Sequence, residues 1–314
     1  MSQLEVQPVE ETSKTKTLAA IGSELIGSFL IFLTIYLVSS LSPSMYGASV
    51  LLIAIATGLV YAAMIAVFGQ FSGGQFNPAV TLVAILTGRT TVLNGIFYII
   101  MQLCGAIAAG SLVRFILPTS QTATAKMWLS AAVNGFDEGS VSATQLQSAG
   151  LSFGVLPAVI VEIAAAIIII ATAVYLMNRD DVSSVQSAAS MGIAYTVGVI
   201  LTYPITGSSL NPARSTGIAI AAQNIKLTVN PLHQLFIFWI CPILTAAIVS
   251  IIVITCKNFG QKTPVEVVEV EENAEIKEED FADPTNLSET NPSGDANFAD
   301  TDADVENDSA TEKI

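Results

Sequence analysis

Six long apolar runs, separated by short polar segments, fill most of the chain up to residue 257. They cover residues 18–41, 48–68, 92–117, 153–178, 188–205 and 231–255. A helix needs about 20 apolar residues to cross the hydrocarbon core of a bilayer. Only helices and closed barrels satisfy their backbone polar groups in lipid, and these runs are too long and continuous for barrel strands. The pattern therefore predicts an all-α membrane protein with six transmembrane helices.

Two further apolar stretches, residues 77–88 and 211–222, are too short to span a bilayer. About 12 residues make about 18 Å of helix, since each residue adds 1.5 Å. Each stretch follows a Gly- and Ser-containing approach, at 71–74 and 206–209, that does not favour a helix. Paired short segments in corresponding halves point to a site at the membrane midplane. We therefore expect two half-helices that meet there.

The two halves of the chain correspond in sequence. An Asn-Pro-Ala tripeptide occurs at 77–79 and again at 211–213, and Glu24 in the first long run has a counterpart, Glu162, in the fourth. Three spans and a half-helix that recur after an odd number of crossings must be inverted in the membrane. The sequence thus predicts an inverted three-helix repeat whose half-helices enter from opposite faces.

The composition supports a membrane protein and places the net charge outside the apolar body. Hydrophobic residues make up 52%, charged residues 12%, and the mean hydropathy is +0.63, whereas a soluble domain has about 25% charged residues. The net charge of −14 resides in residues 259–314, which contain 17 Asp and Glu against three Lys. A soluble enzyme, a nucleic-acid-binding protein and a disulfide-stapled secreted domain are therefore disfavoured.

The chain divides into three parts on this basis. Residues 1–16 are expected to form a cytoplasmic N-terminal segment, and residues 17–258 a membrane domain with repeats over about 17–117 and 153–257. Residues 259–314 are acidic and lack aliphatic clusters, a composition that cannot offset the entropy of ordering. They are predicted to form a disordered cytoplasmic tail.

The acidic tail allows two interpretations. It is a solvated, solubilising segment, or it is a regulatory or trafficking segment in which Thr301 and Ser309 are phosphorylated. Each of these residues has an acidic residue three positions later, as acid-directed kinases prefer. Phosphate would add negative charge to a segment that is already repulsive.

The basic residues near the spans indicate the orientation. With both termini in the cytoplasm, the inner flanks hold six of them: Lys14, Lys16, Arg89, Arg179, Lys257 and Lys262. The outer loops then hold only Arg114, Lys126 and Lys226, with Arg214 left aside. This bias supports cytoplasmic termini and an extracellular loop at 118–152 that is long enough to fold over a pore mouth. We expect the plasma membrane rather than an internal membrane.

The Asn-Pro-Ala tripeptides begin the half-helices with residues suited to that place. Asn is a preferred N-cap whose side-chain oxygen satisfies a free backbone N–H, and Pro suits the first helical position. Ala lets the two helix starts approach closely. Each Asn keeps an amide NH₂ for whatever lies between the helices, where both positive dipole ends point. The candidate pore residues are Asn77, Pro78, Ala79, Asn211, Pro212 and Ala213.

With these motifs the sequence resembles the aquaporin family (major intrinsic proteins). The resemblance covers about 17–257 and is strongest at 72–81 and 211–215. Gln75 departs from it, because the family commonly has His at that position. The resemblance implies a passive water channel, a homotetramer in which every protomer has its own pore, and no cofactor.

The resemblance also implies roles for intramembrane polar residues. Asn77 and Asn211 would bind single-file water at the midplane, where the dipole field opposes proton passage. Glu24 and Glu162 match family glutamates that brace the half-helix loops from behind. Because intramembrane acids are functional by default, a proton-coupling site remains an alternative for these two carboxylates.

A four-residue filter near the outer mouth decides in this family what passes. Arg214 directly follows the second motif, and offsets from the motif asparagines add three residues: Thr57, Val199 and Ser208. The Arg guanidinium offers five donors and a charge that repels cations. Water-selective members typically have Phe and His where this chain has Thr57 and Val199, which implies a wider and less polar constriction. Ser208 stands where some relatives have a mercury-reactive Cys, so we expect weak inhibition by mercurials.

Other markers favour a water-type lineage. Glycerol-conducting relatives usually have Asp after the Arg and a Pro-Leu-type pair in the last span, whereas this chain has Ser215, Ala219 and the pair Phe238-Trp239. The filter contacts the permeant and the markers do not. We therefore expect water and small neutral solutes such as hydrogen peroxide, urea or glycerol to pass, while protons and ions are excluded. A strictly water-selective channel is the alternative.

Three other classes of function compete with a passive channel. A coupled secondary transporter shares inverted repeats and broken helices, but it needs a titratable or ion-binding group where this chain has neutral amides. A non-conducting structural membrane protein would not need the intact Asn77, Asn211 and Arg214. An enzyme or a metal protein is least expected, since one His and three Cys at no ligand spacing assemble no catalytic or metal-binding cluster.

Overall fold

The structure is a computed structural model that describes residues 9–47, 49–179 and 181–260. The first two residues of the predicted acidic tail, 259 and 260, end the last long helix, and the rest of the tail, with its candidate phosphorylation sites Thr301 and Ser309, lies outside the described residues. The start of the N-terminal segment lies outside them as well. The division into three domains therefore stays a prediction.

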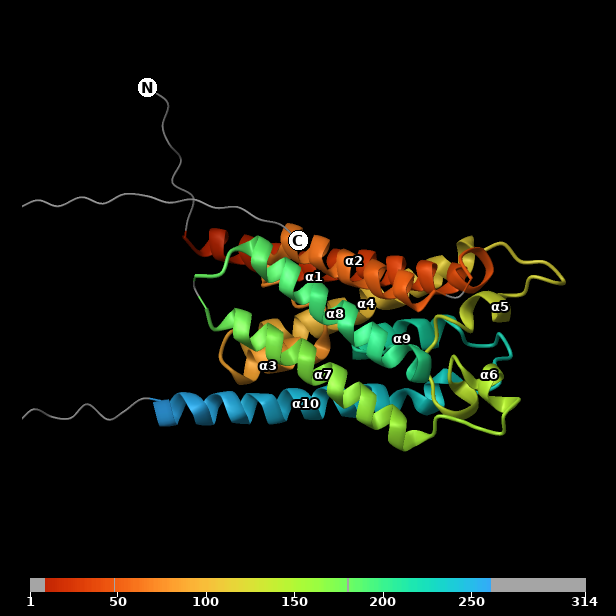
Figure 1. The fold of residues 1–314 in the computed structure, drawn as a ribbon. Coiled ribbons are helices and arrows are strands. Elements are labelled where there is room, and N and C mark those ends of the chain that lie inside the picture. The colour runs from red at the N-terminus through yellow and green to blue at the C-terminus, as the bar shows by residue number, and fades with distance from the viewer. Residues whose placement is uncertain (1–8, 48, 180, 261–314) are drawn as a thin grey trace, which may run out of the picture. The chain divides into compact units, whose positions relative to one another are not determined.

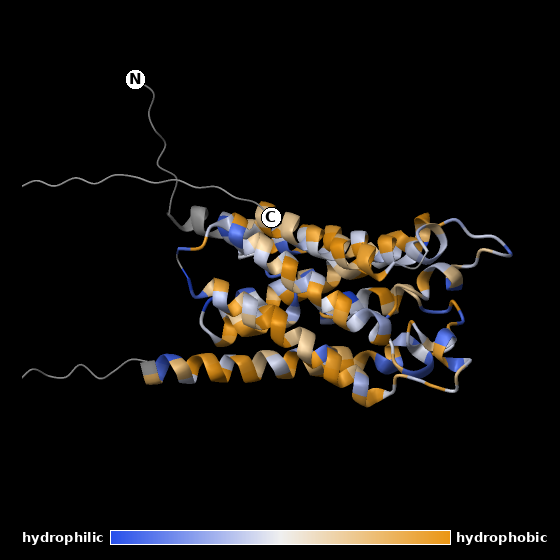
Figure 2. Cartoon of the chain, in the orientation of Figure 1, coloured by the Kyte–Doolittle hydropathy of each residue, from blue (hydrophilic) through white to orange (hydrophobic). Residues whose placement is uncertain are grey.

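The described residues contain six helices that are long and apolar enough to cross a membrane, as predicted. They are α1 (Val9–Met45), α2 (Val50–Ser72), α4 (Val92–Ile116), α7 (Val155–Met177), α8 (Ser184–Thr206) and α10 (Pro231–Gly260). Hydrophobic residues run along the length of these helices (Figure 2). Large aliphatic side chains such as Leu59 and Ile251 are exposed, which suits a surface in contact with lipid.

Two short helices, α3 (Pro78–Leu86) and α9 (Pro212–Ala221), lie between the long helices, one toward each end of the bundle (Figure 1). They contact each other, and each packs on the last long helix of the opposite half, α3 on α10 and α9 on α4. The two predicted half-helices are thus present. Because each half-helix packs on a long helix of the opposite half, these contacts join the two halves of the chain.

The long helices also pack in a repeated pattern. α1 packs on α2 and α4, and α7 packs on α8 and α10, while the contact between α2 and α8 joins the two halves. Two glycines allow this close crossing. A Cβ built on Gly58 would lie 2.5 Å from the carbonyl oxygen of Gly192, and one on Gly192 would lie 2.7 Å from that of Gly58. Small residues let membrane helices approach this closely, so side chains on the facing surfaces of α2 and α8 are brought together.

The loop between α4 and α7, residues 118–152, is folded. It contains three short elements that were not predicted: α5 (Ala125–Leu129), the 3-10 turn η1 (Asp137–Gly139) and α6 (Ala143–Gln147). Phe136 donates its backbone N–H to the Oε1 of Gln234 in α10 (3.0 Å), and the Nε2 of Gln234 donates back to the Phe136 carbonyl (2.9 Å). Trp128 is buried as well. The loop is therefore anchored to the helix bundle instead of hanging free.

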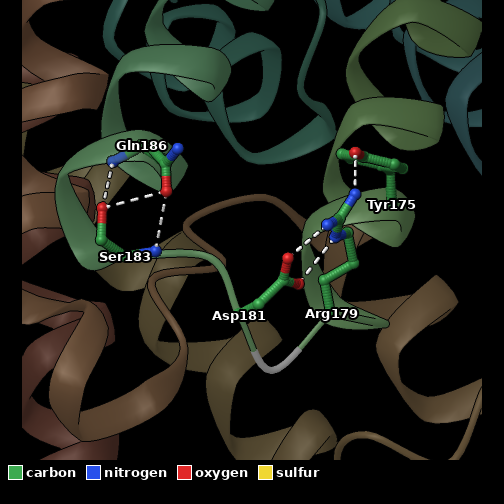
Figure 3. A network of polar contacts seen from close by, with 5 residues as sticks. All are labelled: Tyr175, Arg179, Asp181, Ser183 and Gln186. Carbon is green, nitrogen blue, oxygen red and sulfur yellow. Dashed lines mark hydrogen bonds and ion pairs between the residues drawn. The ribbon is translucent and has the colours of Figure 1, made fainter. Parts of the chain in front are cut away.

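The short link between α7 and α8 is held by exposed polar contacts (Figure 3). Arg179 donates to both carboxylate oxygens of Asp181 and, through Nη1, to the Tyr175 hydroxyl (2.6 Å). The hydrogen bonds from Arg179 lower the pKa of Asp181. Ser183 then caps α8, and Gln186 completes a capping box. A short link of this kind keeps two helices antiparallel neighbours.

Candidate functional site

Asn77 and Asn211 begin the two half-helices with nearly the same backbone geometry. Their φ is −156° in both, and their ψ is 122° and 116°. The Oδ1 of Asn77 accepts from the backbone N–H of Ala79, and that of Asn211 from Ala213, each at 2.9 Å. These are the N-cap bonds expected of Asn before a helix. All six motif residues are buried at this junction: Asn77, Pro78, Ala79, Asn211, Pro212 and Ala213.

Each asparagine also reaches across to the opposite half. Asn77 donates through Nδ2 to the carbonyl of Leu210 (2.9 Å), and Asn211 donates through Nδ2 to the carbonyl of Phe76 (2.7 Å). Phe76 and Leu210 have φ values of 45° and 56°. Such left-handed backbone costs about 1–3 kcal/mol and persists only where the surroundings hold it. The two strained turns present their carbonyls to the opposite asparagines.

Glu24 and Glu162 hold these turns from behind. Both carboxylates are buried, with 0% and 1% exposure. Glu24 accepts the backbone N–H of Phe76 (2.8 Å), and Glu162 accepts that of Leu210 (3.1 Å). The remaining donors to Glu24 are Ser72, Gln75 and Gln102, and those to Glu162 are Thr206 and Ser209. Each carboxylate thus satisfies a loop that would otherwise leave buried N–H groups without acceptors.

Two tyrosines, which were not predicted as site residues, accept the second amide hydrogen of the two asparagines, one tyrosine for each asparagine. Asn77 donates through Nδ2 to the Tyr195 hydroxyl (3.0 Å), and Asn211 donates to the Tyr61 hydroxyl (2.9 Å). Both tyrosines are 1% exposed. Each lies four residues from a candidate filter residue on its own helix, and this spacing places two side chains on one helix face. That spacing alone did not single them out, because most residues in these apolar helices have an equivalent neighbour four positions away.

The four candidate filter residues line one small cavity, which we call the loop-side cavity because it lies toward the 118–152 loop. Its lining includes Thr57, Val199, Ser208 and Arg214. Its volume is about 10 Å³, which is close to the space that a single water requires. The fold therefore brings together residues from α2, α8 and the second motif that were placed only by counting offsets. Their role as a filter stays a prediction.

Arg214 is buried beside this cavity, and its direct partners are uncharged. Its Nη1 donates to the Oδ1 of Asn134, and its Nη2 donates to the carbonyl of Ala132 (3.4 Å). Both partners belong to the 118–152 loop, and the Tyr36 hydroxyl donates to the backbone carbonyl of Arg214. The contact with Asn134 was not predicted. Because neutral groups hold the guanidinium, its positive charge acts on the cavity.

The hydroxyl groups at the cavity differ in hydrogen-bonding capacity. The Oγ of Ser208 has no protein partner among the described residues, so it is free to bond to an occupant of the cavity. The Thr57 hydroxyl donates to the carbonyl of Ile53 in its own helix (2.8 Å), so toward the cavity it can act only as an acceptor. Val199 adds an aliphatic wall. The cavity thus offers donors, acceptors and apolar surface at once.

A second cavity lies on the other side of the junction, and we call it the link-side cavity because residues beside the α7–α8 link line it. Its volume is about 260 Å³. The lining includes Ile65 of α2, Val80 of α3 and Met191 of α8. Among the residues that the structure describes, the two cavities share no lining residue. The half-helix junction therefore lies between a wide approach and a constriction.

Two inverted half-helices that meet between two cavities inside a six-helix bundle define a membrane channel. Comparison with known families agrees. The sequence profile of the Major intrinsic protein family matches residues 11–253, and the chain belongs to this family.

Several relatives of the chain are named aquaporins. Aquaporin Z from Photorhabdus laumondii is 32% identical over 194 residues, which cover 61% of this chain and 76% of the relative. Aquaporin Z from Brucella melitensis is 34% identical over 214 residues, covering 66% and 82%. Aquaporin-5 from Sus scrofa is 29% identical over 247 residues, covering 77% and 82%. The solved aquaglyceroporin from Plasmodium falciparum shares the fold, with a TM-score of 0.58 at 15% identity over 77% of this chain and 99% of that one.

Family membership settles the class of function. Major intrinsic proteins are channels, so the chain is a passive transmembrane channel and an integral multi-pass membrane protein. The expectation of a channel rather than an enzyme is confirmed on this ground.

Proposed function

We propose that this channel conducts water together with small neutral solutes such as hydrogen peroxide, urea or glycerol, and excludes protons and ions. The observation that carries the proposal is the meeting of Thr57, Val199, Ser208 and Arg214 on one cavity beside the half-helix junction. None of these four side chains is aromatic. A hydroxylated or amide-bearing solute would find donors in Arg214 and, in Ser208, a hydroxyl that has no partner among the described residues.

Exclusion of ions follows from the charges that face the pore. The guanidinium of Arg214 is buried and held by neutral partners, so it repels cations that enter the loop-side cavity. Both half-helices direct their positive dipole ends at the midplane. A cation thus meets positive potential twice, whereas a neutral solute meets none of this repulsion.

The size of the loop-side cavity favours a second candidate, a strictly water-selective channel. A volume of about 10 Å³ suits one water, and a larger solute requires side chains to move. The two candidates differ in whether Thr57 and Val199 leave room for that movement.

A coupled transporter is the remaining alternative from another class. It would need an intramembrane carboxylate free to exchange protons, and Glu24 and Glu162 are the candidates. Backbone N–H groups and neighbouring side chains already donate to both of them. We therefore propose that the two glutamates brace the half-helix loops, and that flux is insensitive to proton and sodium gradients.

The placement in the membrane is proposed on the bias of basic residues and on family resemblance. Both termini are assigned to the cytoplasm, the 118–152 loop to the extracellular side, and the protein to the plasma membrane. A homotetramer with a pore in each protomer is the proposed assembly. Exposed aliphatic side chains along the long helices would contact lipid or neighbouring protomers.

Stopped-flow light scattering on proteoliposomes tests the proposal. The full chain is reconstituted, and water, urea and glycerol gradients are compared with those of Arg214→Ala and of the control Arg89→Ala, which removes an exposed arginine outside both cavities. Fast water flux with measurable solute flux supports the proposed permeant range. Water flux without solute flux supports the strictly water-selective alternative. Water permeability at the lipid background in folded protein would overturn the proposal.

A further inference from the structure

Tyr61 and Tyr195 lie at the position along the pore where the two cavities end. On α2, Tyr61 is one helical turn from Thr57, which lines the loop-side cavity, and one turn from Ile65, which lines the link-side cavity. On α8, Tyr195 likewise lies one turn from a lining residue of each cavity. Both tyrosines line the loop-side cavity and neither lines the link-side cavity. The pair therefore separates the two.

The two rings close the space between them. Their centroids are 3.4 Å apart and their planes differ by 7°, so they are stacked face to face at van der Waals distance. A water molecule cannot pass between rings at this separation. The close crossing of α2 and α8 enforces it, because Gly58 and Gly192 lie three residues before the two tyrosines and bring the helices together.

The tyrosine hydroxyls also occupy the hydrogen-bonding positions that a midplane water would use. Each asparagine amide has two hydrogens. One goes to a backbone carbonyl of the opposite half and the other to a tyrosine hydroxyl, for Asn77 and for Asn211 alike. Neither amide keeps a hydrogen for a permeant. The rings and the hydroxyls thus act at the same place. The rings fill the pore, and the hydroxyls accept the amide hydrogens that the asparagines would otherwise donate to a permeant.

We propose that Tyr61 and Tyr195 form a midplane barrier that closes the pore in this structure and limits the permeability of the channel. Conduction requires the stacked rings to separate, and this frees the amides of Asn77 and Asn211 for the permeant. The inference rests on the proposed function, since a barrier has meaning only in a pore that conducts. It goes beyond the filter, because the tyrosines would limit water as well as larger solutes.

The test compares water permeability per reconstituted protein among matched variants of the full chain. The pair Tyr61→Ile/Tyr195→Val removes both rings. The pair Tyr61→Phe/Tyr195→Phe keeps the rings and removes both hydroxyls. Tyr175→Val serves as the control, because Tyr175 lies on α7 and lines neither the loop-side nor the link-side cavity. Size-exclusion chromatography and circular dichroism establish that each variant is folded.

We expect the aliphatic pair to raise water permeability about tenfold, since a stacked aromatic pair and its hydrogen bonds correspond to at least that factor in rate. The phenylalanine pair is expected to fall between wild type and the aliphatic pair, and Tyr175→Val to equal wild type. The temperature dependence of water flux provides a second readout that does not depend on protein amount. Its activation energy should fall from wild type to the phenylalanine pair to the aliphatic pair.

Contrary outcomes separate the inference from the proposed function. A wild type that conducts, with an aliphatic pair of equal permeability and equal activation energy, would overturn the barrier and leave the channel intact. A phenylalanine pair whose activation energy equals that of wild type would overturn the anchoring by the hydroxyls. If wild type and the aliphatic pair were both folded and impermeable, the proposed conduction would be refuted, and the barrier with it.

Discussion

The two faces of the half-helix junction are built from corresponding residues but differ in their chemistry. The third residue after Asn77 is Val80, which lines the link-side cavity, whereas the third residue after Asn211 is Arg214, which lines the loop-side cavity. One face is an approach of about 260 Å³ and the other is a constriction of about 10 Å³. The inverted repeat thus supplies one scaffold twice, and the two faces differ because individual residues of the two copies differ.

The two repeats are alike in the residues that stabilise the backbone of the half-helix loops. Glu24 and Glu162 both accept the N–H of the left-handed residue that precedes the motif asparagine. Both asparagines cap their helix and donate across the junction. Strained backbone has few ways of being stabilised, so both repeats have a buried carboxylate that accepts the strained residue's N–H. The lining of a cavity has no such requirement and is free to diverge.

Removing a bracing glutamate should have the largest effect on folding and stability, because it removes acceptors that hold the half-helix loops in place. Glu24→Ala leaves the buried N–H groups of Gln75 and Phe76 without an acceptor, at about 1–3 kcal/mol for each group. We expect little folded protein, and a clearly lower thermal midpoint in detergent for what remains. Glu162→Ala should act in the same direction. The control Glu24→Gln keeps an acceptor oxygen and should lose less, and a thermal midpoint of Glu24→Ala equal to wild type would contradict the bracing role.

Arg214→Val should reduce the difference in charge between the two faces, since the corresponding residue of the first repeat is Val80. Loss of the guanidinium removes the positive charge and enlarges the loop-side cavity. We expect urea permeability to rise roughly tenfold, which corresponds to about 1.4 kcal/mol off the barrier, and cations to leak where wild type excludes them. Stopped-flow flux and a membrane-potential dye measure the two effects. Unchanged urea flux and unchanged cation exclusion would show that the face difference does not depend on this charge.

Ser208→Cys should distinguish the two cavities chemically, because it places a thiol in the loop-side cavity only. The native Cys104, Cys241 and Cys256 do not line either cavity, so wild-type flux should respond weakly to mercurials. The variant should lose most of its water flux on treatment and regain it with excess thiol. Strong block of wild type, abolished by replacing one native Cys, would instead place that residue on the permeation path.

The smallest effect is expected at the exposed link between α7 and α8, which lies away from the junction. The pKa of Asp181 is lowered by Arg179, so the pair stabilises the fold at pH above the pKa of an unfolded Asp, about 3.9. That contribution disappears as the pH falls through the lower folded-state pKa. Because exposed ion pairs contribute little, Asp181→Asn should leave water flux and the thermal midpoint at neutral pH unchanged. A clear drop in either would assign the link a larger role.

Much of the architecture was predictable from local pattern. Runs of about 20 apolar residues can only become spanning helices in lipid, and a short run that begins with Asn-Pro is pre-organised as a helix start. The short helices of the 118–152 loop were not predictable in this way. Five-residue helices such as α5 and α6 carry too little periodicity, and their position depends on partners such as Gln234 in α10.

The candidate site was predictable in part for the same reason. Asn77, Asn211 and Arg214 stand in or beside a repeated motif, so the sequence marks them directly. Asn134 lies in a loop without a motif, and only the folded loop brings it to the guanidinium. Tyr61 and Tyr195 are ordinary aromatic residues in apolar helices, and their contact depends on the crossing of two helices that are far apart in the chain.

Local sequence pattern was therefore enough to predict the number of spans, the inverted repeat, the two half-helices and the residues at their starts. These features follow from hydropathy and capping, which act over a few neighbouring residues. The folded chain was needed to show which side chains face each other across the pore and how wide each cavity is. It was also needed to show that two tyrosine hydroxyls accept the remaining amide hydrogens of the motif asparagines. Those features depend on helix crossings and on distances of a few ångströms between segments more than 100 residues apart, and no local pattern encodes them.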